Sequence, residues 1–239
     1  MFPNPGAVNN LLRGRYREPT FVGAKRIVAT GSMAEYPLAL NTISGIAPGD
    51  LCWFALSKHL QSQGISGGDG GWQGISYPYT SPIFTSVVYW WKAGLTANDI
   101  ANTKVRAFGG LNEAIDILVW RNAKRAVLRT DKYWSNGRPD TPPPLKIPAF
   151  TRSSDALGVF AHLFSSNYSA ATMGPMKLQP ANVTMNARID DFGATAQYKS
   201  FAADMLNTVS LFGQEVQAAL PSFGVGNFLL GTYWELRAT

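Results

Sequence analysis

The chain has 239 residues, which is enough for one large all-β domain or two smaller domains. Charged residues make up only 15% of it, below the roughly 25% usual for soluble domains, so we expect a surface that is neutral-polar or covered by partners. The one cysteine, Cys52, excludes an internal disulfide framework and a thiolate zinc cluster, and its apolar neighbours predict a buried side chain.

The net charge of +6 is concentrated in two basic segments, Arg13–Arg17 and Arg121–Arg129. Neither segment has a nucleic-acid reading motif or interleaved stacking aromatics, so nucleic acid is not an expected partner. No stretch reaches the ~18 continuous apolar residues of a membrane helix, and the first residues do not resemble a secretory signal. We therefore expect no membrane partner.

Residues 1–23 are predicted to form an extended N-terminal arm that lies on another subunit, because its prolines favour extended backbone. Its leucines would be apolar anchors and its arginines would form salt links. The candidate partner-binding residues are Leu11, Leu12, Arg13, Arg15, Tyr16 and Arg17. Residues 24–239 are predicted to form the folded domain.

Strand signals dominate the first part of that domain. Residues 24–32 and 36–44 are expected to form an opening pair, and 50–57 is apolar on both faces, as in a central strand. Further β-branched, aromatic or alternating segments follow at 85–93, 103–109 and 113–122. The only helical signal between them is a short turn after Gly94, with Thr96 or Asn98 as its cap.

A proline-rich connector follows at about 135–148 and excludes a helix or a central strand there. Strand signals resume at 156–165, 176–189, 196–206 and 227–237. In each part an aspartate, Asp50 or Asp155, leads into an apolar strand, and a polar loop and an aromatic strand come next. We interpret this as weak halves, 24–130 and 145–239, of one antiparallel, jelly-roll-like β-sandwich, with two tandem small domains as the alternative.

Few residues are arranged for catalysis or metal binding. His59 and His162 occupy similar places in the two halves, but no third ligand accompanies them, so we predict neither a metal nor another cofactor. The glycine-rich segment at 64–71 lacks the lysine and hydroxyl of a phosphate loop and is expected to be a loop at one end of the sandwich. The sequence predicts no catalytic residues.

Aromatic side chains near that loop are the other candidate ligand site. Tyr77 and Tyr79 lie two residues apart on one side of an extended segment, and Trp72 precedes them. Tyrosine and tryptophan rings stack on sugars and anchor interfaces, although core packing is the more common use of such residues. The three residues are therefore candidate ligand-binding residues.

A series of short motifs recurs in order along 43–122: Gly49–Leu51, Gly71–Trp72, Trp91–Ala93, Asp99 and Trp120–Arg121. This order resembles β-sandwich structural proteins of tailed bacteriophages and prophages, and 156–238 resembles them more loosely. The resemblance implies a non-enzymatic virion component, such as a head decoration, fibre or tail-tip protein, assembled in the host cytoplasm.

The resemblance also implies the partners, which would be other virion structural proteins and further copies in a homo-oligomer. The alternative function is a carbohydrate- or receptor-binding module at a virion tip, with a host surface glycan as its ligand and Trp72, Tyr77 and Tyr79 as its contacts.

Overall fold

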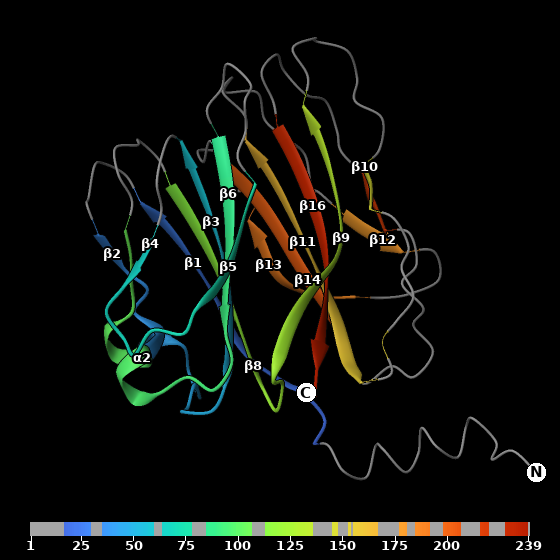
Figure 1. Ribbon diagram of the computed structural model, residues 1–239. Helices are drawn as coiled ribbons and strands as arrows, with labels where there is room; N and C mark the ends of the chain where they lie inside the picture. The colour runs from blue at the N-terminus through green and yellow to red at the C-terminus, as the bar shows by residue number, and fades with distance from the viewer. Residues whose placement is uncertain are drawn as a thin grey trace, which may run out of the picture.

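Figure 1 shows the computed structural model of the chain. The described residues are 17–29, 35–59, 64–77, 85–106, 113–135, 145–147, 153, 155–166, 177–180, 185–191, 198–206, 216–219 and 228–238. Leu11–Tyr16 and Tyr79 lie outside them, as does the side chain of His59.

The described residues of the first part of the chain form eight strands and two short helical turns. They are β1 (Thr20–Ala29), β2 (Glu35–Pro37), η1 (Leu40–Thr42), β3 (Leu51–His59), β4 (Gly64–Ser66), β5 (Gln73–Tyr77), β6 (Thr85–Lys92), α2 (Ala97–Asn102), β7 (Lys104–Arg106) and β8 (Glu113–Arg121). The remaining strands are β9 (Arg125–Ser135), β10 (Leu145–Ile147), β11 (Ala156–Ser166), β12 (Lys177–Pro180), β13 (Asn186–Asp191), β14 (Tyr198–Leu206), β15 (Val216–Ala219) and β16 (Phe228–Arg237).

The described strands pair antiparallel, and this confirms the predicted all-β class. The first sheet has the order β1-β8-β3-β6-β5, and the second sheet has the order β13-β14-β11-β16-β9. The two five-stranded sheets pack as a sandwich in which β1 lies against β13 and β8 against β14. Figure 1 shows the first sheet in blue to green and the second in yellow to red.

The two halves share one topology. Adding eight to each strand number of the first sheet gives β9-β16-β11-β14-β13, which is the second sheet. The same shift converts the small sheet β2-β7-β4 into the small sheet β10-β15-β12. The sequence repeat between the halves is therefore a repeat of an eight-strand unit, with each unit supplying one sheet of the sandwich.

The passage from one sheet to the other occurs earlier than the proline-rich connector. β9 pairs along its length with β16 in the second sheet, although the sequence pattern placed residues up to 130 in the first half. The change of sheet therefore falls at 122–124, between β8 and β9. The boundary between the two halves is set by the backbone hydrogen bonds between β9 and β16, which are distant in sequence. The amino-acid composition around residue 122 does not indicate it.

The opening strands also differ from the prediction. β1 begins at Thr20, within the predicted arm, and pairs with β8 instead of the following segment. The predicted strand at 36–44 contains only short β2, and η1 follows after Ala39, whose φ is 46°. In contrast, the predicted helical turn after Gly94 is present as α2, which begins after Thr96, one of its two predicted caps; Thr96 and Asp99 form a capping box.

The main core lies between the two sheets and is mostly aromatic. Trp53 on β3 is fully buried, and its ring centroid lies 5.2 Å from that of Phe160 and 5.7 Å from that of Trp234. Tyr89 on β6 stacks on Trp53 at 5.3 Å. Because inward residues alternate along each strand, the other face of β3 is free for a second contact.

That outer face of the first sheet is covered by a second apolar cluster. Cys52, Phe54 and Leu56 point into it from β3, and Leu38 and Leu40 come from the segment around η1. Burial on this face explains why residues 51–56 are apolar without alternation. It also confirms Cys52 as a buried side chain, and burial raises the pKa of its thiol.

Candidate functional site

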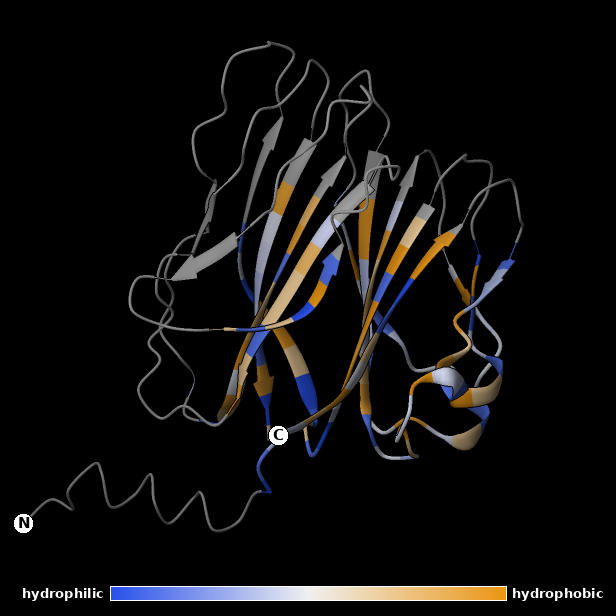
Figure 2. Ribbon diagram, turned by 180° about the vertical axis from the view of Figure 1, so that it is seen from behind, coloured by the Kyte–Doolittle hydropathy of each residue, from blue (hydrophilic) through white to orange (hydrophobic). Residues whose placement is uncertain are grey.

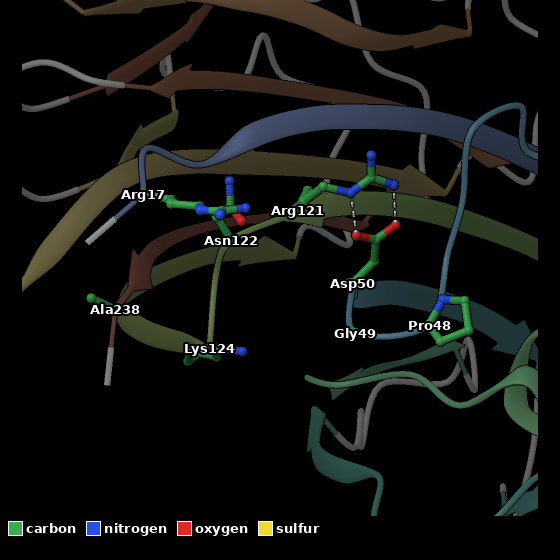
Figure 3. Close-up of a pocket in the computed structure, with 8 residues that line it drawn as sticks. All are labelled: Arg17, Pro48, Gly49, Asp50, Arg121, Asn122, Lys124 and Ala238. Carbon is green, nitrogen blue, oxygen red and sulfur yellow. Dashed lines mark hydrogen bonds and ion pairs between the residues drawn. The ribbon is translucent and has the colours of Figure 1, made fainter. Parts of the chain in front are cut away.

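A pocket of about 440 Å³ lies at the end of the sandwich where β8 passes into β9. Both ends of the described chain reach it. Figure 2 shows hydrophilic residues gathered at this end, near the C-terminus. The lining residues, drawn in Figure 3, are Arg17, Pro48, Gly49, Asp50, Arg121, Asn122, Lys124 and Ala238. We call it the basal pocket.

An ion pair forms one wall of the basal pocket. Asp50 is 1% exposed, and Arg121 contacts it through two hydrogen bonds, Nε to Oδ1 at 2.9 Å and Nη2 to Oδ2 at 3.0 Å. Nη2 also donates to the carbonyl of Gly45 at 2.7 Å. The hydrogen bonds to Asp50 raise the pKa of Arg121. This two-point geometry fixes the turn before β3 against the end of β8.

The second half repeats this arrangement. Asp155 leads into β11 as Asp50 leads into β3, and Arg237 at the end of β16 lies 3.8 Å from its carboxylate. Arg237 also pairs with buried Glu235 at 3.0 Å and donates to Ser153 at 2.6 Å. The aspartate that the sequence shows before each central strand therefore pairs with the arginine that closes the same half.

The rim of the basal pocket carries two exposed cations, Arg17 and Lys124. Among the described residues, neither side chain has an anionic partner. Asn122 between them adopts a φ of 65°, which asparagine tolerates better than most residues, and its side chain donates to the carbonyl of Glu18 at 2.9 Å. The rim is thus a fixed turn that presents positive charge.

Of the predicted partner-binding residues, only Arg17 lies within the described chain, and it lines the basal pocket. Leu11, Leu12, Arg13, Arg15 and Tyr16 precede it and lie outside the described residues. Sequence reasoning selected Arg17 for its position in a basic run. It missed Lys124, because only the fold brings the β8–β9 turn next to the N-terminal segment.

His162 lies fully buried between the sheets. Its Nε2 is 3.1 Å from Oδ2 of Asp116, and its Nδ1 is 3.3 Å from the hydroxyl of Tyr89. Because an ionised carboxylate only accepts, Nε2 carries a hydrogen and donates it to Asp116. The described residues contain no group of three or more side chains placed to hold a metal ion.

Asp116 joins three elements across the interior. Nη1 of Arg26 on β1 lies 3.2 Å from its Oδ1 and also hydrogen-bonds to Ser200 on β14. Burial alone raises the pKa of Asp116, but the hydrogen bond from His162 and the nearby Arg26 charge hold the pKa below its ordinary value. The geometry ties the sheets together, and all the partners of Asp116 are parts of the sandwich.

Trp72 and Tyr77, the two candidate ligand-binding aromatics within the described chain, are used in packing. Trp72 is half-buried, with its ring centroid 5.4 Å from that of Phe54 in the outer cluster. Tyr77 is also half-buried; its hydroxyl donates to Asp131 on β9 at 2.5 Å, and its ring contacts Tyr89. Trp72 and Tyr77 thus face opposite sides of the first sheet, and the structure does not bring them together as one exposed platform.

The glycine-rich segment was predicted to be a loop throughout, but its first three residues form β4 and pair with β7. Residues 67–71 are a loop that folds against α2. Asp99 on α2 is buried and accepts from the backbone of Asp69 at 3.0 Å, and Lys92 pairs with it at 2.6 Å. Gly67 has a φ of 70°, and a Cβ there would lie 2.1 Å from the carbonyl oxygen of Asn102. Glycine is therefore needed for close approach to the helix end, as in a structural loop at the sandwich edge.

Replacement of Asp99 by asparagine is expected to lower the free energy of unfolding at pH 7 by about 1–3 kcal/mol, because the partners of a buried charge lose its hydrogen bonds. Burial raises the pKa of Asp99, but Lys92 and the Thr96 and Asp69 amides hold the pKa below its ordinary value. Its stabilisation is therefore present above about pH 4 and is lost as the pH falls through the lowered pKa. Urea unfolding at pH 7 and pH 3 measures both effects.

Asp99→Asn should lose less stability than the wild type between these pH values. Glu18→Gln, which removes an exposed carboxylate, should follow the wild type. Parallel losses in the wild type and Asp99→Asn would show that Asp99 does not contribute to acid sensitivity.

No protein-family model, curated protein or solved structure matches this chain. Among the described helices, none has the length and apolar character needed to span a membrane.

Proposed function

We propose that this protein is a non-enzymatic structural component of a tailed-phage virion, a decoration, fibre or tail protein that acts through protein–protein contacts. The motif resemblance is the source of the virion assignment. The residues of these motifs stabilise the fold: Asp50 pairs with Arg121, Lys92 pairs with Asp99, and Trp72 packs on the outer cluster. A motif built from such residues describes a scaffold.

The structural observation that supports attachment through the arm is the position of the basal pocket. The N-terminal segment meets the sandwich there, and Arg17 of that segment lines the pocket together with the β8–β9 turn. An arm that begins at an open, charged pocket places its partner against the end of the sandwich. Attachment would then use the arm and this end together.

The described interior supports a scaffold role as well. Its buried carboxylates have basic partners within the sandwich: Asp116 has Arg26, Asp204 has Arg188 at 2.8 Å, and Glu235 has Arg237. Such pairs fix the relative position of strands and sheets more than they add net stability. We therefore assign these buried carboxylates a structural role, which is to hold the strands and sheets in position.

The test compares the full chain with one that lacks residues 1–17 and one in which they are replaced by a glycine–serine segment of equal length. Because β1 begins at Thr20, both variants should fold with an unchanged urea midpoint. Neither should reach the oligomeric mass of the full chain in solution or be incorporated into particles. Light scattering and quantitative immunoblotting of purified particles give the two readouts.

Normal incorporation of both variants would contradict attachment through the arm. Incorporation of the glycine–serine variant alone would show that only the length of the segment matters, which also contradicts the proposal because its leucines and arginines would then be dispensable.

A further inference from the structure

The charges around the basal pocket are unbalanced. Asp50 is its only described acidic lining residue, and Arg121 satisfies that carboxylate at two points. Arg17 and Lys124 then remain as exposed cations with no anionic partner in the described part of the chain. The pocket as a whole is therefore positive and suited to an anion.

The other lining groups fit an extended peptide better than a bare ion. Pro48 and Ala238 supply apolar contact, and Gly49 exposes backbone beside them. The amide nitrogen of Asn122 is committed to Glu18, while none of the described hydrogen bonds uses its side-chain oxygen, which can accept from a peptide N–H. The volume of about 440 Å³ lies in the range of ligand pockets.

The charge also decides between partners. The arm of a second copy is a poor occupant, because residues 1–17 contain Arg13, Arg15 and Arg17 and no acidic residue. A nucleic-acid strand would place successive phosphates along the rim, where only two cations are unpaired, and near the buried carboxylate of Asp50. An acidic segment of a different protein needs only one or two carboxylates at this place.

We propose that the basal pocket binds an acidic, extended segment of a partner protein, with Arg17 and Lys124 as its carboxylate contacts. This rests on the proposed function and deepens it, since it names the chemistry of the contact beside the arm. Exposed large hydrophobic side chains are rare in the described part of the chain, where Val28 is one example, so charge is the better guide to docking on this surface.

The test uses the full chain and fluorescein-labelled hexaglutamate, with hexaglutamine as the neutral control, in fluorescence anisotropy. A salt concentration of about 0.1 M screens general attraction to the net charge beyond about 10 Å. Hexaglutamate should bind about tenfold more tightly than hexaglutamine, and the double variant R17Q/K124Q should lose about that factor.

The matched control is K104Q/R106Q, which removes two exposed cations from β7 outside the pocket. It changes the net charge equally and should alter hexaglutamate binding by less than about threefold, because surface pairs contribute little. Equal losses of hexaglutamate affinity in the two double variants would show that only the net charge matters and would overturn the proposal. The absence of a preference for hexaglutamate would also overturn it.

A ten-nucleotide oligothymidylate is the competing probe, and tighter, R17Q/K124Q-sensitive binding of this probe would replace the peptide proposal with nucleic acid. Unchanged urea midpoints verify that both double variants are folded. The peptide assay involves no particles, so its failure leaves the arm-deletion result standing. If the chain binds hexaglutamate but never enters particles, the binding of acidic segments by the basal pocket stands and the virion role is rejected.

Discussion

Replacement of Asp116 by alanine is expected to lower the free energy of unfolding by about 3–5 kcal/mol, the cost of breaking a buried ion pair by removal of one partner. The variant removes the carboxylate that accepts from Nε2 of His162 and from Nη1 of Arg26 inside the sandwich. Urea unfolding at pH 7 measures the loss. The effect is large because His162 is fully buried, and its Nε2 cannot reach water unless the two sheets separate.

Glu35→Ala is the matched control. Glu35 pairs with Lys104 and Arg106 at the surface, where ion pairs contribute about 0–1 kcal/mol. A double-mutant cycle of Asp116 and His162 to alanine should show strong coupling, because each residue is the buried partner of the other. A loss below about 1 kcal/mol for Asp116→Ala would contradict a buried, ionised network at this position.

Replacement of Trp53 by alanine is expected to cost about 3–5 kcal/mol, because it opens a cavity at the centre of the aromatic core. Its ring contacts Tyr89, Phe160 and Trp234, so the loss affects packing in both sheets. Urea unfolding gives the free energy, and near-ultraviolet circular dichroism reports the packing of the remaining aromatic rings.

Trp72→Ala is the control, since Trp72 packs on Phe54 in the outer cluster and is only half-buried. It should lose less than half as much stability, in proportion to the smaller area that it buries. Equal losses of stability at the two positions would contradict the assignment of the main core to the space between the two sheets.

Local patterns were sufficient to predict the fold class. Residues 51–56 are apolar throughout because β3 is covered on both faces. Thr96 was one of the two caps that the sequence indicated for α2, and its capping box with Asp99 selects it. The repeated aspartates Asp50 and Asp155 indicated the two related halves. In each case the determining interactions lie within a few residues of one another or repeat along one strand.

The candidate site depends on contacts that the sequence does not order. Arg17 and Lys124 are more than a hundred residues apart, and only the pairing of β1 with β8 and of β9 with β16 brings them to one rim. Asp116 appears in the sequence as the one polar residue within the apolar run 114–120. The sequence showed its partner His162 only as the counterpart of His59 in the second half, and the packing of the two sheets buries it.

The aromatic site illustrates the opposite difficulty. Trp72 and Tyr77 have side chains that suit sugar binding. The sequence does not indicate toward which face of the sheet either side chain points. In the structure Trp72 packs on the outer cluster and Tyr77 contacts the inner core, since the two positions differ by an odd number of residues along an extended segment. Residue type therefore predicted that Trp72 and Tyr77 make large contacts, but not toward which side of the sheet they point.

The most direct test of the structural role is quantitative mass spectrometry of density-purified particles produced from the genome that encodes this chain. The proposal predicts that the chain copurifies with the particles at a fixed ratio to their major capsid protein through successive gradients. A chain that is abundant in the soluble lysate and absent from purified particles would contradict it.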